Sequence, residues 1–206
     1  LTRYDFIGIK EEIRMINIPE SAYEVKRALY RLKYEELLKY QLKVKYMMYM
    51  RKSHPEGVMI PYLKERLDQF IKNLPFALTT DQIAAVENIL DDMGAPYKMN
   101  RLLQGEVGSG KTVVAAVALL ASVSAGFQGA IMVPTEVLAY QHYQTFCDLF
   151  AHEDVKIRLL TSSVSAKDRK EILDALAQGQ IDIIIGTHSL FQKDVIFKKL
   201  GLVVTD

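Results

Sequence analysis

The first third of the chain has the hydrophobic pattern of a helical segment. Ser21 followed by Glu24 is a capping-box pattern, and no Gly or Pro interrupts the stretch from Ala22 to about Lys52. The apolar residues of this stretch keep only a rough helical period, with Lys and Tyr between them. We therefore predict one long helix that packs on one side and is solvated on the other. Around it we expect a mixed lead-in over 1–20, a loop over 53–61 and a short helix over 62–73.

From Pro75 onward the pattern changes to helices that alternate with strands. A helix is predicted to begin at Thr79 and to end at Gly94, with an apolar face made of Ile83, Val86, Leu90 and Met93. Beyond it, apolar runs without period-2 alternation are separated by helical stretches, which is typical of a parallel sheet covered on both faces. The expected strands are 101–104, 130–133, 155–160, 181–185 and 202–205, and the expected helices are 111–124, 136–150 and 166–177.

The composition is that of an ordinary globular protein, with half of the residues hydrophobic and a quarter charged. No window approaches about 18 uninterrupted apolar residues, so we expect no membrane-spanning helix and no membrane partner. An N-terminal targeting pattern is also lacking. The single cysteine, Cys147, cannot form an internal disulfide and fits a reduced cytoplasmic setting.

The charge is distributed unevenly, although the net value is only +1. Residues 1–75 hold 15 Lys and Arg against 10 Asp and Glu, whereas the remainder holds 11 against 15. A basic first third is compatible with contact to nucleic-acid phosphates. It is equally compatible with the solvated face of a Lys-rich helix, and charge alone does not separate the two interpretations.

The clearest chemical motif is GEVGSGKT (105–112), which matches the phosphate-loop pattern G-x-x-x-x-G-K-[ST]. It follows a predicted strand and opens a predicted helix, as phosphate binding by backbone N–H groups at a helix N-terminus requires. Lys111 would neutralise β- and γ-phosphate oxygens, and the Thr112 hydroxyl would bind Mg²⁺. The alternative is a Gly-rich turn that merely starts a helix. The residues predicted to hold an ATP-type nucleotide here are Gly105, Gly108, Ser109, Gly110, Lys111 and Thr112.

A second magnesium-side residue is expected where another strand ends. The run LVVTD (202–206) consists of apolar residues followed by an acidic one, so we predict this role for Asp206. An Asp after a strand is often only a turn residue, but a phosphate loop in the same chain favours the metal role. Lys111 and Asp206 are therefore the candidate catalytic residues.

Two further signals have both a structural and a functional interpretation. Thr79 and Gln82 form a T-x-x-Q capping box that needs no ligand, but the Gln82 amide could also read the adenine edge. Thr135 and the turn 186–188 each follow a strand, and Thr135 is a plausible N-cap. Because ligands of open α/β sheets bind beyond the carboxyl ends of the strands, both turns are expected on the nucleotide's edge. The four histidines show no metal-ligand spacing.

In this order, the motifs resemble the RecG family of superfamily 2 DNA helicases. The strings that carry the resemblance are RLLQGEVGSGKT (101–112), PTEVLAYQH (134–142), LLTSSVSAKDRKEIL (159–173), IDIIIGTHSLFQ (181–192) and LGLVVTD (200–206). The upstream stretches 24–42 and 74–82 look like the segment that joins the wedge domain to the first motor lobe. The resemblance covers about residues 9–206.

The resemblance implies an α/β fold: a RecA-like P-loop parallel sheet with helices on both faces, preceded by a helical linker. Residues 1–75 would be the linker between the wedge and motor regions, and 76–206 the first motor lobe. The parent protein would be a cytoplasmic, monomeric, ATP-dependent DNA helicase that uses Mg²⁺. It would remodel forked DNA and Holliday junctions in repair and recombination.

The resemblance also implies roles for individual residues. Gln82 would recognise adenine, with Phe76 stacking nearby; Lys111 and Thr112 would form the Walker A pair, and Asp206 would begin Walker B. The residues expected near DNA are Thr135, Glu136, Gln141, His142, Thr187 and His188.

The chain departs from the family pattern at a few places. Ser162 stands where the family usually has Gly, which puts the DNA contact of that turn in doubt, and Glu106 replaces a more usual Asp. The Walker B glutamate and the second motor lobe, with its arginine, would follow Asp206. We therefore expect an internal fragment that binds nucleotide weakly and has no helicase activity alone.

Two other function classes remain open from the residues themselves. A small-molecule kinase would need several arginines near the phosphates, but only Arg158 and Arg169 follow Lys111. A non-catalytic interaction module could use bound nucleotide only to hold its shape.

Overall fold

The computed structural model describes residues 6–53 and 57–206. The chain divides into two compact units, residues 1–55 and 56–206. Residues 54–56 of the expected loop and 1–5 of the expected lead-in lie outside the described residues. The sequence-based division into a linker and a motor lobe at residue 75 stays a prediction.

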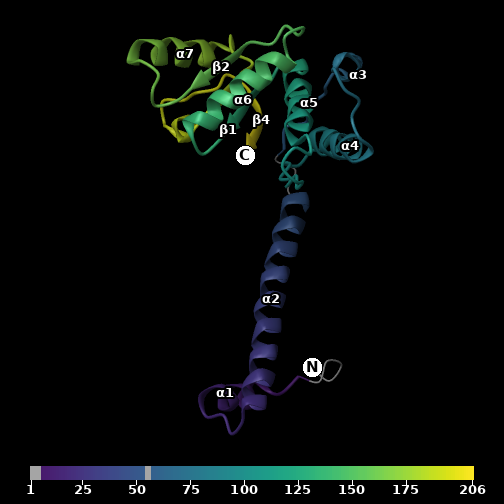
Figure 1. Ribbon diagram of the computed structural model, residues 1–206, viewed down its shortest axis with the longest axis vertical. Coiled ribbons are helices and arrows are strands. Elements are labelled where there is room, and N and C mark those ends of the chain that lie inside the picture. Colours follow the sequence, from purple (N-terminus) through teal and green to yellow (C-terminus); the bar gives the residue numbers. More distant parts are fainter. Residues whose placement is uncertain (1–5, 54–56) are drawn as a thin grey trace. The chain divides into compact units, whose positions relative to one another are not determined.

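The first unit consists of two helices, α1 (Ile9–Asn17) and α2 (Ala22–Ser53). The long helix α2 confirms the prediction from the uninterrupted stretch. The short helix α1 was not expected in the lead-in; it lies beside the first turns of α2 (Figure 1). Its buried residues are Glu12 and Met15.

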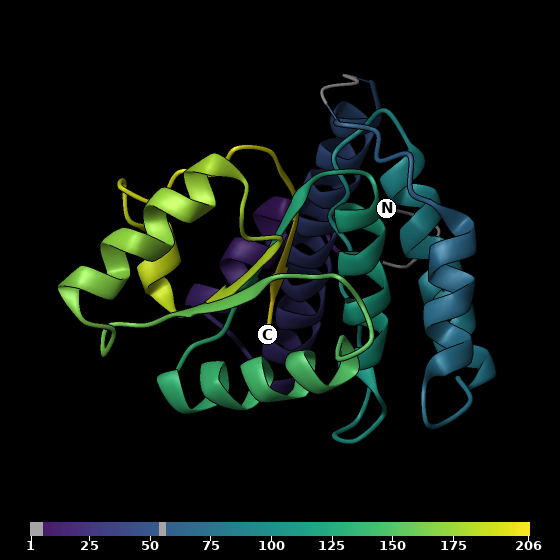
Figure 2. The same cartoon turned by 90° about the horizontal axis from the view of Figure 1, so that it is seen from above.

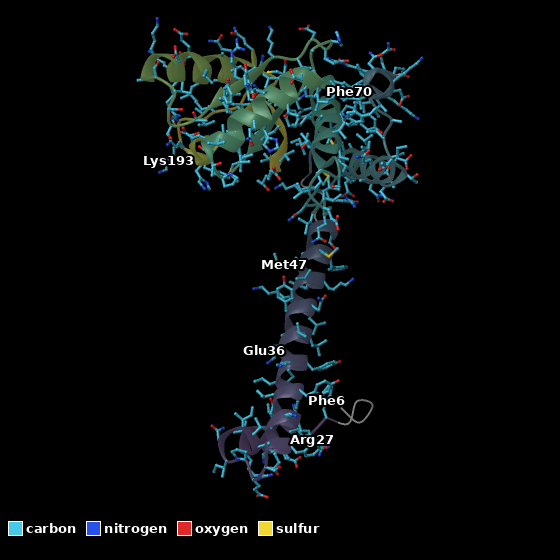
Figure 3. All side chains as sticks on the ribbon, in the orientation of Figure 1. Phe6, Arg27, Glu36, Met47, Phe70 and Lys193 are labelled. Carbon is cyan, nitrogen blue, oxygen red and sulfur yellow. The ribbon has the colours of Figure 1, made fainter. Side chains whose placement is uncertain are left out.

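A buried charge holds α1 on α2. The Arg31 guanidinium of α2 is 95% buried; its Nε lies 2.9 Å from Glu12 Oε2, although the pair is not aligned as a hydrogen bond. The guanidinium also donates to the Ile7 carbonyl oxygen and, at 3.1 Å, to Glu35 Oε1. Phe6, labelled in Figure 3, packs on Tyr34 with ring centroids 4.6 Å apart. The contacts of this buried arginine thus join α1 and the residue Ile7 before it to α2.

The second unit is built on a parallel four-stranded sheet in the order β2-β3-β1-β4. Each of the four strands begins two residues from the predicted start and ends within one residue of the predicted end. The strands are β1 (Gln128–Met132), β2 (Ile157–Leu160), β3 (Ile183–Gly186) and β4 (Leu200–Thr205).

The strand expected over 101–104 was a wrong prediction, because these residues are not part of any strand. The segment offers only two adjacent apolar residues, and Leu102 is 80% exposed. Arg101 is instead paired with Asp92 of the preceding helix, at 2.7 Å. That ion pair keeps the segment beside α4 (Thr80–Gly94) rather than in the sheet.

Helices cover both faces of the sheet, as the sequence predicted. Alternate residues of β3 enter different clusters: Ile183 and Ile185 pack with α5 (Lys111–Ser124) and α6 (Glu136–Leu149), and Ile184 packs with α7 (Ala166–Gln178). Figure 2 shows α7 on one side of the strands and α5 and α6 on the other. The helix α5 is buried along nearly its whole length, and it contacts β1 and β4.

Two more helices pack around α5. The helix α4 buries Val86, Ile89 and Met93, so Ile89 replaces the expected Ile83 and Leu90 at the centre of its buried face. The helix α3 (Lys64–Asn73) contacts α5, and a short 3₁₀ helix, η2 (His188–Phe191), follows β3. In the described part of the chain, no helix is both long and apolar enough to cross a membrane.

An aromatic stack joins α3 to the end of α6. The ring of Phe70, labelled in Figure 3, lies 5.2 Å from that of Phe150, which in turn lies 6.1 Å from Phe146. Phe146 is 1% exposed. The stack therefore fixes α6, whose first turn and middle carry several of the predicted site residues.

Replacing Phe146 by Ala should lower the free energy of unfolding of this chain by about 3–5 kcal/mol, because a fully buried ring leaves a cavity. The measurement is urea denaturation, with circular dichroism as the signal that monitors unfolding. The matched control is Tyr140→Ala, an exposed ring on the same helix, which should change the stability by less than about 1 kcal/mol. Equal losses for both variants would show that the stack does not fix α6.

Candidate functional site

The phosphate loop curls because two of its glycines adopt left-handed backbone angles. Gly108 has φ 80° and Gly110, the N-cap of α5, has φ 79°. Both values favour glycine over any other residue. A Cβ on Gly110 would also lie 2.2 Å from Gln82 Nε2, and one on Gly105 would lie 2.5 Å from Ser109 Oγ. The backbone angles therefore favour glycine at Gly108 and Gly110, whereas the contact at Gly105 could be relieved by rotation of the Ser109 side chain.

The Lys111 side chain folds back over the loop. Its Nζ donates to the carbonyl oxygens of Gly105 and Glu106, each at 2.9 Å. The ammonium group thus lies against the curl of the loop, at the N-terminal end of α5. Backbone N–H groups at that end have no partner within the helix, so positive charge and free donors coincide there. This arrangement suits the oxygens of a polyphosphate.

Gln82 links the phosphate loop to α4. Its Oε1 accepts from the Thr79 N–H at 2.8 Å, and the Thr79 hydroxyl accepts from the Gln82 N–H at 3.3 Å, which confirms the capping box. In addition, Gln82 Nε2 donates to the Ser109 carbonyl oxygen at 2.9 Å. The amide retains one N–H and one lone pair, so its adenine-reading role stays a prediction. The predicted stacking of Phe76 on adenine also stays a prediction; its ring is half exposed.

The two predicted magnesium-side residues lie on elements that pack together. Thr112 is the second residue of α5, and Asp206 follows β4, with which α5 is in contact. The Asp206 N–H donates to the Met132 oxygen at 3.0 Å, which continues the pairing of β4 with β1. Both side chains offer oxygen ligands, which Mg²⁺ prefers. Among the described residues, no cluster of three or more His, Cys, Asp or Glu is placed to hold a metal.

The structure joins Asp206 to a residue that was predicted for a different ligand. His142 Nε2 lies 2.8 Å from Asp206 Oδ2. Sequence reasoning missed this contact because the two residues are 64 positions apart and belong to different motifs. The histidine therefore faces the carboxylate that was predicted for the magnesium side.

The turns after β1, β2 and β3 meet in an open groove of about 500 Å³. Carboxyl ends of neighbouring parallel strands lie at one edge, and the turns that carry Thr135 and residues 186–188 do line the same groove. That this is also the nucleotide's edge stays a prediction. Four of the six residues predicted to be near DNA line this groove, whereas Gln141 and His142 do not. The lining residues are Pro134, Thr135, Glu136, Ser162, Thr187, His188, Ser189 and Gln192.

A carboxylate network crosses the groove. Glu136 Oε1 accepts from the Ser162 hydroxyl and from the Ser163 N–H, the latter at 3.2 Å. The Ser162 hydroxyl, followed by the other bonds from this turn, holds the pKa of Glu136 below its ordinary value. The Ser162 hydroxyl thus bonds the turn after β2 to α6. The glycine that the family usually has at this position lacks a side chain that could make this bond. The Thr135 hydroxyl accepts from the Leu138 N–H, so its N-cap role is confirmed.

Arg169 of α7 supports the far wall of the groove and was not singled out from the sequence for this role. Its guanidinium donates to Gln192 Oε1 at 2.7 Å and to Asp194 Oδ2 at 2.9 Å. The hydrogen bond from Arg169 lowers the pKa of Asp194. Local sequence patterns do not predict contacts between residues more than 20 positions apart.

Gln82→Glu should separate the two contacts of this side chain. A glutamate can still cap α4, but it cannot donate to Ser109 and places a carboxylate against that carbonyl. We expect unchanged thermal stability and about tenfold weaker binding of both ADP and GDP, measured by fluorescence titration of the full-length gene product. Thr79→Ala is the control, and should lose about 1 kcal/mol of stability and keep its affinity. Weaker binding of ADP alone would instead indicate adenine reading.

Ser162→Gly should raise the pKa of Glu136 toward its ordinary value of 4.5, because the main hydrogen bond to the carboxylate is lost. A lowered carboxyl pKa stabilises the folded state above the ordinary value, and this contribution disappears as the pH falls through the lowered value. The variant should therefore lack most of this contribution at neutral pH, and its stability should depend less on pH in the acid range. Carboxyl ¹³C NMR titration measures the shift. Ser162→Ala should behave in the same way; a change in the glycine variant alone would assign the effect to the backbone.

Comparison with known proteins places these features in a family. Residues 79–206 match the family model described as DEAD/DEAH box helicase. The ATP-dependent DNA helicase RecG of Bacillus subtilis is 48% identical over 196 residues, which is 95% of this chain and 29% of the relative. The RecG of Streptococcus pneumoniae is 41% identical over 206 residues, 100% of this chain and 30% of the relative. The chain thus spans about 30% of the length of these curated relatives.

The similarity extends to three dimensions. A solved structure of RecG bound to a three-way DNA junction superposes with a TM-score of 0.83 and 41% identity, and covers 98% of this chain and 28% of the RecG chain. The parallel sheet with helices on both faces agrees with that structure, so the expected α/β RecA-like fold is confirmed. The chain therefore belongs to the DEAD/DEAH box helicase family, and its similarity to RecG extends over nearly its whole length.

Proposed function

We propose that this chain is the nucleotide-binding motor lobe of an ATP-driven DNA helicase that remodels branched DNA. The observation that carries the proposal is that the groove and Asp206 lie at one edge of one parallel sheet. The turns after β2, β3 and β1 form the groove, and Asp206 follows the adjacent strand β4. The buried helix α5, which begins in the phosphate loop, packs on both β1 and β4. A change at the nucleotide can therefore act on the groove through a short path.

The nucleotide would be ATP with Mg²⁺. The glycine curl would receive the β-phosphate, Lys111 would pair with phosphate oxygens, and Thr112 and Asp206 would hold the metal. When bound, the metal would supply positive charge that stabilises the negative charge developing on phosphoryl transfer. Gln82 would keep the loop closed against α4 while its remaining amide groups face adenine.

The groove would hold a DNA strand by its backbone. Its lining supplies hydroxyl, amide and imidazole groups, which contact phosphates without reading sequence. One oxygen of the acidic Glu136, Oε1, accepts from Ser162 and Ser163, so this oxygen is not free to face an anionic ligand. The relatives' description as ATP-dependent DNA helicases and the three-way junction bound by one RecG structure favour branched DNA.

The remaining parts of the proposal concern the whole protein. Residues 1–75 would connect a wedge region to the motor, and 76–206 would form the first of two motor lobes. The protein would act as a monomer in the cytoplasm, on forks and Holliday junctions during repair and recombination. A kinase is disfavoured further, because Arg169 is bound to Gln192 and Asp194, and the Arg158 guanidinium donates to the Ile157 oxygen.

Lys111→Ala tests the mechanism in the full-length gene product. ATP turnover and unwinding of a forked duplex should fall by about 100-fold or more, because the cation at the phosphates is lost. Circular dichroism should show an intact fold, and binding of DNA without nucleotide should be unchanged. Lys170→Ala, an exposed lysine on α7, is the control and should keep full activity. Unwinding at the normal rate by the Lys111 variant would defeat the proposal.

A further inference from the structure

The contact between His142 and Asp206 is held from both sides. The His142 side chain is 16% exposed, and its ring lies 6.2 Å from that of the buried Phe146. The Asp206 side chain is 55% exposed, but its backbone is fixed by the bond to Met132. The 2.8 Å distance between Nε2 and Oδ2 thus joins a well-packed ring to the carboxylate of a residue whose backbone is bonded to the sheet.

This geometry suits a hydrogen bond that orients a metal ligand. An ionised carboxylate can only accept, so Nε2 carries the hydrogen. The bond occupies Oδ2 and fixes the rotation of the carboxylate, which leaves Oδ1 available to a cation. Carboxylates that bind metals are commonly oriented by such outer partners, and loss of the partner costs about 10–100-fold in metal affinity or activity.

The helix that carries His142 also lines the groove. Thr135 caps α6 and Glu136 is its first residue, and both line the groove. His142 follows Glu136 by six residues, about 9 Å along a helix. No Gly or Pro lies between them, and Ala139 is fully buried beneath. This part of α6 is therefore one uninterrupted helix, with groove contacts at one end and the Asp206 contact at the other.

We propose that His142 is a positioning residue for Asp206, and that through α6 it couples occupation of the groove to binding of the divalent cation. In this role His142 does not contact DNA, unlike the role that the sequence resemblance implied. The inference rests on the proposed function, because it takes Asp206 as a magnesium-side residue.

The test compares His142→Ala, His142→Gln and the control His152→Gln, which changes an exposed histidine on the turn after α6. Cation affinity is measured in the full-length gene product with ADP, by electron paramagnetic resonance of Mn²⁺. His142→Ala should weaken Mn²⁺ binding by about tenfold or more. His142→Gln should recover most of the affinity, because its amide nitrogen can donate from nearly the place of Nε2. The control should match the wild type.

Two further readouts separate positioning from DNA contact. The affinity for a forked duplex without nucleotide should be unchanged in His142→Ala. In the wild type, addition of the duplex should change the Mn²⁺ affinity, and reciprocity requires Mn²⁺ to change the DNA affinity by the same factor. In His142→Ala this coupling factor should be one, so that the duplex no longer changes the Mn²⁺ affinity. Circular dichroism of each variant establishes that it is folded.

Weaker DNA binding by His142→Ala with normal Mn²⁺ affinity would overturn the proposal and favour the DNA-contact role. Failure of His142→Gln to recover Mn²⁺ affinity would overturn it as well. The proposed function fails separately, if Lys111→Ala unwinds DNA normally. Loss of unwinding in Lys111→Ala together with wild-type Mn²⁺ binding in His142→Ala would defeat only the present inference.

Discussion

Parallel pairing of four strands is the constraint on which the candidate sites depend. Each strand of a parallel pair runs in the same direction, so the turns after β1, β2 and β3 must emerge together. The groove is therefore made by residues that are far apart in sequence but adjacent in the sheet order. The buried helix α5 keeps this sheet in contact with the phosphate loop, because the loop runs without interruption into a helix that the core encloses. Nucleotide and groove residues are thus parts of one packed body.

Much of this arrangement was predictable from local sequence. The helix α5 begins and ends at the expected residues, since Gly110 stops the loop and an unbroken run of small and apolar residues follows. The strand at 101–104 was wrong because two apolar residues did not outweigh an ion pair from Arg101. The helix α1 was missed because its stability depends on the buried Arg31, which lies in another helix. Local patterns carry no information about such a partner.

The same reason limits prediction of the site. The phosphate loop is a contiguous motif, and its curl was predicted from its glycines. The bonds from Ser162 to Glu136 and from His142 to Asp206 join residues 26 and 64 positions apart, and each links two motifs that sequence reasoning treated separately. At Gln82 the predicted capping bond is present, and the same side-chain amide also bonds the phosphate loop, which was not predicted. Assigning a role to each motif separately therefore misses the hydrogen bonds that join residues of different motifs.

The amide of Gln82 also constrains how the nucleotide site can move. Its Nε2 leaves no room for a side chain at Gly110 and is bonded to the carbonyl next to it. Any displacement of the loop away from α4 must break that bond or pull on the cap of α4, which is worth about 1 kcal/mol. Loop opening that keeps this bond would therefore be accompanied by fraying of the first turn of α4. Amide hydrogen exchange at the start of α4 would then report on the state of a phosphate loop almost thirty residues away.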